Sequence, residues 1–68
     1  MRNVDWPIAV RSVDIARPLR PLDGLSRYSR VRVFVSRGET LIRSIDIWNR
    51  GAPAISVLRL KDEIASQL

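Results

Sequence analysis

The sequence predicts an α+β domain, a small three-stranded and mostly antiparallel sheet with one C-terminal helix packed on one face (β-β-β-α). Three observations predict this fold. Valine alternates with polar or aromatic residues over residues 30–36, which is the period of a strand with one buried face. A turn at Arg37-Gly38 joins this run to a second strand-like run that ends at Trp48. Apolar residues then recur at spacings of three and four over residues 57–68, the period of an amphipathic helix.

The N-terminal part of the chain predicts the first strand. Residues 1–7 are expected to form an extended lead-in, because a proline ends them. Residues 8–15 are rich in β-branched side chains, but their apolar positions change face, since 8 and 10 share one parity and 13 and 15 the other. Either a bulge near Arg11-Ser12 reconciles the two halves, or only residues 13–15 pair firmly.

A connector and a hairpin follow. Residues 17–24 contain two prolines, which lack amide donors, so we expect a loop there rather than a central strand. In the second strand the two faces differ: the inward side chains are Val31, Val33 and Val35, and the outward ones are Arg30, Arg32 and Phe34. The third strand covers residues 40–48 and directs Leu41, Ile45 and Ile47 inward, and Ile42, Ser44, Asp46 and Trp48 outward. Arg43 interrupts the inward face, so we expect it near an edge with its charge in water.

The tail from Ser56 predicts the helix. The Ser56 hydroxyl is placed to accept a hydrogen bond from the amide of Leu58 or Arg59, as an N-cap does. The apolar stripe Val57, Leu60, Ile64 and Leu68 then packs on the valine face of the sheet, while Arg59, Asp62, Glu63 and Gln67 face away.

The composition restricts the chemistry. The 68 residues include neither cysteine nor histidine, so disulfides are excluded, catalysis by these side chains is excluded, and a zinc site is disfavoured. We expect one domain over residues 1–68 that is not an enzyme, with no catalytic, metal-binding or cofactor-binding residue. No apolar run approaches the roughly 20 residues of a membrane span, and no signal peptide is evident, so we expect a cytoplasmic protein. The net charge of +5 comes almost wholly from arginine, which indicates either an anion-binding surface or a compositional bias.

The outward face of the hairpin is the candidate site. Arg30, Arg32, Phe34 and Trp48 are expected to share this face, and interfaces favour Arg and aromatic side chains. We therefore expect a partner surface for a protein or a covalently linked domain. Three alternatives stay open: the aromatics stack on nucleic-acid bases between the arginines, they cover a second small core, or the sheet edges pair into a homodimer.

Two isolated carboxyl groups complete the candidates. Asp14 and Asp46 both lie in predicted strands, where an ion pair with arginine across strands is expected rather than acid–base catalysis.

The order of motifs resembles a known family. The run Asp14-Ile15-Ala16-Arg17-Pro18-Leu19 has the form D-I/L-x-x-P-L, and a leucine-rich connector with Tyr28, a valine strand, a glycine turn and a helix S-x-x-x-L-x-x-x-I follow it. Over residues 8 to 68 this resembles the short N-terminal region that precedes the catalytic domain in some bacterial family 2 glycosyltransferases. The family's Asp-x-Asp metal motif is absent, and Ile42-Arg43 stands where the family usually has a small residue. The resemblance therefore implies a non-catalytic accessory domain, with no catalytic residue to carry over.

Overall fold

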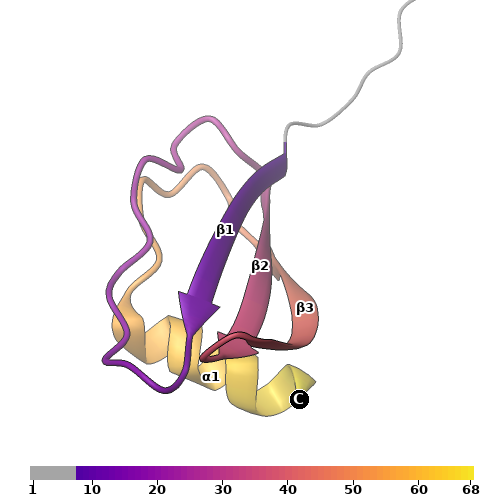
Figure 1. Ribbon diagram of the computed structural model, residues 1–68. Coiled ribbons are helices and arrows are strands. Elements are labelled where there is room, and N and C mark those ends of the chain that lie inside the picture. Colours follow the sequence, from indigo (N-terminus) through magenta and orange to yellow (C-terminus); the bar gives the residue numbers. More distant parts are fainter. Residues whose placement is uncertain (1–7) are drawn as a thin grey trace, which may run out of the picture.

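Three strands and one helix make up the regular structure of residues 8–68, the part of the chain that the computed structural model describes (Figure 1). They are β1 (Ile8–Asp14), β2 (Arg30–Arg37), β3 (Thr40–Trp48) and α1 (Val57–Gln67). The α+β class and the β-β-β-α order are confirmed. The lead-in expected over residues 1–7 lies outside the described residues.

The sheet is mixed, so the prediction of a mostly antiparallel sheet is wrong. The strand order is β1-β2-β3, with β1 parallel to β2 and β2 antiparallel to β3. The two-residue turn at Gly38 and Glu39 reverses the chain between β2 and β3, and Gly38 has the positive φ of 60° that such a turn requires. Residues 15–29, in contrast, carry the chain back to the end of the sheet where β1 began. A crossover of this length is what a parallel pair needs.

β1 pairs with β2 without interruption. The register runs from Ile8 opposite Arg30 to Asp14 opposite Ser36, so both expectations, a bulge near Arg11-Ser12 and firm pairing of residues 13–15 only, are wrong. Ala9 and Val13 point inward and are buried, whereas Ile8 and Val10 are exposed on the other face. The change of parity in the sequence therefore reflects apolar side chains on both faces of a regular strand.

A β-bulge lies in β3 instead. Val35 opposes Arg43 and Ser36 opposes Leu41, which leaves Ile42 as an extra residue. An extra residue reverses the side-chain parity beyond it. Leu41, expected in the core, is consequently 60% exposed.

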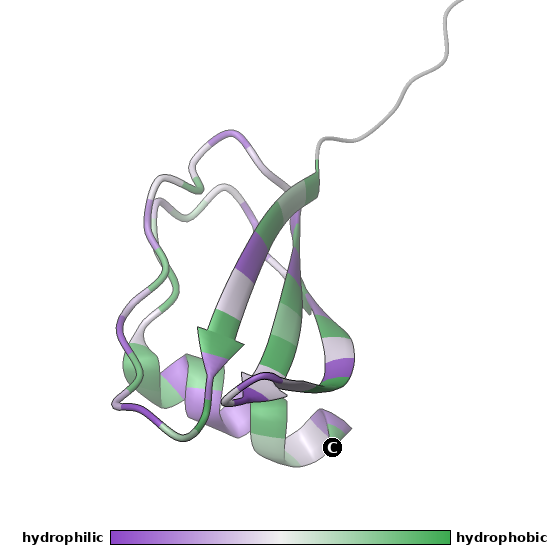
Figure 2. Ribbon diagram, in the orientation of Figure 1, coloured by the Kyte–Doolittle hydropathy of each residue, from purple (hydrophilic) through white to green (hydrophobic). Residues whose placement is uncertain are grey.

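The core lies between the inner face of the sheet and a layer made of α1 and two loops. In Figure 1, residues 15–29 and residues 49–56 run side by side, and α1 crosses one end of the sheet. Figure 2 shows hydrophobic residues along the strands, interrupted by polar ones, and a continuous hydrophobic stretch at the start of β1. The buried apolar residues are Ala9, Val13, Leu22, Leu25, Val31, Val33, Val35, Ile45, Ile47, Ile55, Leu60 and Ile64.

The two loops are held together by main-chain bonds and by one buried side chain. Leu22 and Ile55 exchange backbone hydrogen bonds of 3.0 and 2.7 Å. Asn49 is fully buried, and its side-chain amide nitrogen donates to the carbonyls of Leu25, Tyr28 and Ala52 at 2.8, 2.9 and 2.9 Å. This amide therefore supplies the donor for three carbonyls that the loops leave without strand partners.

Helix α1 follows the prediction at its start. The Ser56 hydroxyl accepts from the Arg59 amide at 3.1 Å, which confirms the N-cap. Leu60 and Ile64 are buried as expected, whereas Leu68 is 51% exposed and ends the stripe early.

The polar side of α1 differs from the prediction. Arg59 and Gln67 do not face away: the Arg59 guanidinium donates to the Trp48 carbonyl, and the Gln67 amide donates to the Asp46 carbonyl at 2.9 Å. Long side chains can reach the backbone of a neighbouring strand while their stems cover apolar surface. These two side chains therefore cover the free edge of β3. Arg43 lies at this edge as predicted, where it donates to the Gln67 carbonyl at 2.6 Å.

Candidate docking surface

The four residues predicted as a partner surface come together on the outer face of the sheet. This face is opposite to the one covered by α1 and the loops. Arg30 opposes Trp48 across β2 and β3, and Arg32 and Phe34 follow along β2 on the same side. On the β1 side their neighbours are Ile8, Val10 and Ser12. We call the set Ile8, Val10, Arg30, Arg32, Phe34 and Trp48 the outer patch.

Arg30 and Trp48 form one unit of the outer patch. The guanidinium carbon of Arg30 lies 5.0 Å from the centroid of the Trp48 ring, which is a cation–π distance. Trp48 is nevertheless 63% exposed. Within residues 8–68, Arg30 makes no ion pair, so its N–H groups stay available to an acceptor from outside.

Arg32 is committed to a carboxylate. Its Nε and Nη2 donate to the two carboxylate oxygens of Asp46 at 2.9 and 3.2 Å, which confirms the cross-strand ion pair expected for Asp46. The hydrogen bond from Arg32 lowers the pKa of Asp46, and the same bond raises the pKa of Arg32. Two parallel bonds fix the geometry of this pair in a way that a lysine could not.

Asp14 does not form the cross-strand ion pair that was predicted for it. Its Oδ1 accepts from the amides of Gly38 and Ala16, both at 2.9 Å, and its other oxygen lies 3.9 Å from Nε of Arg17, a local neighbour. The hydrogen bond from Gly38 is the largest cause of its lowered pKa, followed by the bond from Ala16. Asp14 thus joins the end of β1 to the hairpin turn.

The apolar members of the outer patch are accessible. Ile8 and Val10 are 41% and 55% exposed. Phe34 is half-buried between Ser12 and Ser44, and it is absent from the core cluster. The alternative of a second small core is therefore not seen in residues 8–68. Sequence reasoning missed Ile8 and Val10 as surface residues. Their shared parity assigns them to the outer face only when the pairing of β1 with β2 is known.

The charges of the outer face cancel. Its four rows of side chains, from the row of Ile8 to the row of Asp14, carry two arginines and two aspartates: Arg30, Arg32, Asp14 and Asp46. The positive excess of the chain therefore resides mainly elsewhere.

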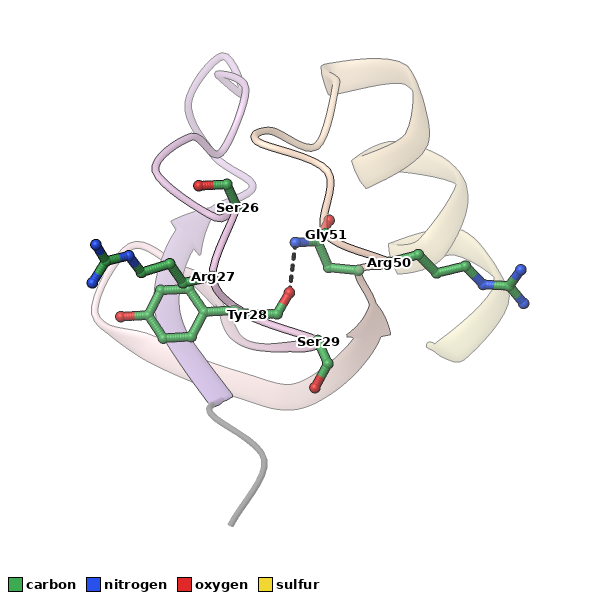
Figure 3. Close-up of a pocket in the computed structure, with 7 residues that line it drawn as sticks. Ser26, Arg27, Tyr28, Ser29, Arg50 and Gly51 are labelled. Atoms are coloured by element: carbon green, nitrogen blue, oxygen red, sulfur yellow. Dashed lines mark hydrogen bonds between the residues drawn. The ribbon is translucent and has the colours of Figure 1, made fainter. Parts of the chain in front are cut away.

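A shallow pocket lies between the residues that precede β2 and those that follow β3, and its polar side chains do not point to a common centre. It measures about 290 Å³ and is lined by Ser26, Arg27, Tyr28, Ser29, Asn49, Arg50 and Gly51. Figure 3 shows the side chains of Arg27 and Arg50 pointing in opposite directions, away from each other. The Asn49 amide nitrogen is used by backbone carbonyls, and its oxygen is sealed from solvent. No group of three or more acidic side chains that could hold a metal ion occurs within the described range.

No helix among these residues is long and apolar enough to cross a membrane. Searches for a matching family model, for a similar curated protein and for a similar solved structure gave no match.

Proposed function

We propose that this chain is a non-catalytic docking domain whose outer patch binds a protein or a covalently linked domain. The observation that carries the proposal is the sheet face that α1 and the loops of residues 8–68 leave uncovered, on which exposed apolar and aromatic side chains lie beside a balanced set of charges. Trp, Phe and Arg are enriched where proteins bind each other.

The outer patch also defines the chemistry of its partner. Ile8, Val10 and Phe34 form an apolar strip that an apolar surface would cover. Arg30, stacked on Trp48, retains donors that a carboxylate would fill. The partner is therefore a protein surface with an apolar area that covers this strip and an acidic side chain that reaches Arg30.

On the resemblance described above, this partner is the sugar-transfer domain of a bacterial glycosyltransferase. The support for this part of the proposal is the order of motifs over residues 8–68. The chain would then act by positioning that domain and not by chemistry of its own.

The alternative is a small basic nucleic-acid-binding protein. The Arg30–Trp48 stack favours it, because an aromatic ring beside an arginine suits a base and its phosphate. The carboxylates of Asp14 and Asp46 on the same face disfavour it, because they repel phosphates and because Asp46 neutralises Arg32. We therefore rank it second.

Calorimetry with a purified sugar-transfer domain tests the docking proposal. The domain is taken from the reading frame that continues or adjoins this chain in its genome. The double variant Phe34→Ser, Trp48→Ser should bind at least about tenfold more weakly than the wild type, since anchors of this kind contribute 2 kcal/mol or more. Leu58→Ser is the matched control, because Leu58 is 72% exposed on α1, away from the outer face.

Two results would overturn the proposal. Unchanged binding of the double variant would remove the outer patch from the interface. Unfolding of the double variant, seen by far-UV circular dichroism, would make the two aromatics core residues. A labelled single-stranded oligonucleotide tests the alternative: binding should weaken steeply with salt, and no binding at low salt eliminates it.

A further inference from the structure

Both edge strands of the sheet carry an arginine at an inward position. Arg11 in β1 lies opposite Val33, and Arg43 in β3 is paired with Val35, both of which are fully buried valines. Neither guanidinium enters the core, because each turns to main-chain carbonyls at the rim. Inward-pointing charges on edge strands are one way in which proteins prevent the addition of a further strand.

Hydrogen bonds from three side chains cover the edge of β3. Arg59 and Gln67 of α1 donate to the carbonyls of Trp48 and Asp46, and Arg43 ties the end of α1 to the same edge. A strand that approached β3 would have to displace the helix side chains.

Within residues 8–68, fewer side chains cover the edge of β1 than the edge of β3. The Ile15 amide donates to the Ser36 carbonyl, so in this parallel pair the odd positions of β1 bond to β2. The even positions, including Val10 and Ser12, therefore direct their N–H and C=O groups outward. Within residues 8–68 the side chain found at this edge is Arg11, which donates to the Val10 carbonyl at 3.0 Å and to the Asp23 carbonyl at 3.4 Å.

The side chains of β1 would also allow it to pair with β1 of a second copy of the chain. Antiparallel pairing centred on Val10 places Val10 against Val10 of a second copy, and Ile8 against Ser12 of that copy. Over residues 8–12 no charged side chain of the outer face stands in this register, and two exposed β-branched side chains would be covered. On the inner face, however, the two copies of Arg11 become diagonal neighbours of like charge.

We propose that Arg11 guards the β1 edge against pairing with a second copy of this chain. It acts by its charge and by its hold on the Val10 carbonyl. Because the edge of β3 is covered, replacing Arg11 by an uncharged residue leads to a closed dimer and not to a filament. The proposal does not depend on the docking function, because it concerns the association state of the chain and Arg11 lies on the inner face, although the pairing itself would cover Ile8 and Val10 of the outer patch.

Sedimentation velocity over a wide range of protein concentration tests the guard. The wild type and Arg11→Lys, which retains the charge, should remain at 7.8 kDa. Arg11→Met, which keeps an unbranched stem and loses the charge, should move to twice that mass as concentration rises. Arg11→Gln is a second charge-free variant with the same expectation, and it retains a donor for the Asp23 carbonyl if the methionine variant folds poorly.

Two further variants fix the site of association. Adding Val10→Lys to Arg11→Met should restore the monomer, because it places a charge at the centre of the register. Arg43→Met, the matched change on the covered edge, should stay monomeric. Folded charge-free variants at Arg11 that remain monomeric would overturn the proposal, as would a dimer that Val10→Lys leaves intact or a wild type that already dimerises through β1.

Discussion

Arg32 and Asp46 face each other across β2 and β3, and their guanidinium and carboxylate are joined by two hydrogen bonds of 2.9 and 3.2 Å. The pair lies one row from the Arg30–Trp48 stack, so the outer face presents a neutral, fixed polar centre beside Arg30, which makes no ion pair within residues 8–68. A neutral centre costs a protein partner less to desolvate than two separate charges would. The pair therefore favours docking of a protein over binding of a phosphate backbone.

The two aspartates of the outer face should make stability depend on acid. Hydrogen bonds lower the folded-state pKa of both Asp14 and Asp46. Their contribution is therefore complete above the unfolded value of about 3.9, and it is lost as pH falls through the lower folded values. Urea unfolding at a series of pH values should give a constant free energy near neutrality and a decline below about pH 4.

Substitutions separate the two carboxyl groups. Asp14→Asn keeps an acceptor for the Gly38 amide but loses the titration, so the decline should become shallower with little loss near neutrality. Asp46→Asn removes the charge that holds Arg32 and should flatten the decline as well. Asp62→Asn removes an exposed carboxylate on α1 and is the control. An acid decline of unchanged slope in both variants would contradict the assignment.

Asn49 should be the most sensitive polar residue of the described chain. Asn49→Ala removes the side-chain donor to the carbonyls of Leu25, Tyr28 and Ala52, at a cost of about 1–3 kcal/mol, although the Leu25 carbonyl still accepts from the Tyr28 amide. Asn49→Asp should cost more, because it replaces the donor by a buried carboxylate. Urea titration measures both, with Ser44→Ala on the exposed side of β3 as the control. A loss as small as that of the control would show that water replaces the amide.

The inner face of the hairpin could be predicted from the sequence because it depends on local periodicity. Val31, Val33 and Val35 alternate with polar or aromatic residues, and Ile45 and Ile47 alternate with polar residues in the same way on β3, where they pair with Val33 and Val31. The parallel pairing of β1 could not be predicted, because it depends on the path of the loop formed by residues 15–29. The bulge at Ile42 was equally hidden, because Leu41 and Ile42 are both apolar and the sequence does not say which of them is the extra residue.

The candidate site was predictable in part for the same reason. Arg30, Arg32 and Phe34 share one parity of a single strand, so their common face follows from β2 alone. Ile8 and Val10 join them only through the register of β1. Arg59 and Gln67 were assigned to solvent because helical spacing gives only the direction of the Cα–Cβ bond. It does not show that a long side chain can fold back and bind the carbonyls of a strand edge.

Gly38 should tolerate asparagine better than alanine. Its φ of 60° lies in the left-handed region, and a Cβ there would meet no atom within 4 Å, so the cost is conformational and not steric crowding by neighbours. Gly38→Ala should lose about 1–2 kcal/mol of unfolding free energy, and Gly38→Asn clearly less, since asparagine enters this region more readily. Both variants keep the amide that donates to Asp14. Equal losses for the two, measured by urea titration, would point to a changed turn.

The start of α1 leaves room for a stabilising change. Ser56 caps the helix, and the first turn contains no acidic residue. Ser56→Ala should lose about 1 kcal/mol, because the Arg59 amide then lacks its acceptor. Ser56→Asp should match or exceed the wild type, because it keeps an acceptor and adds a negative charge at the positive end of the helix dipole, a gain of about 0.3–1 kcal/mol that salt should reduce. Thermal unfolding at low and high salt measures both variants, and a gain for Ser56→Asp that persists in high salt would mean that the dipole is not its cause.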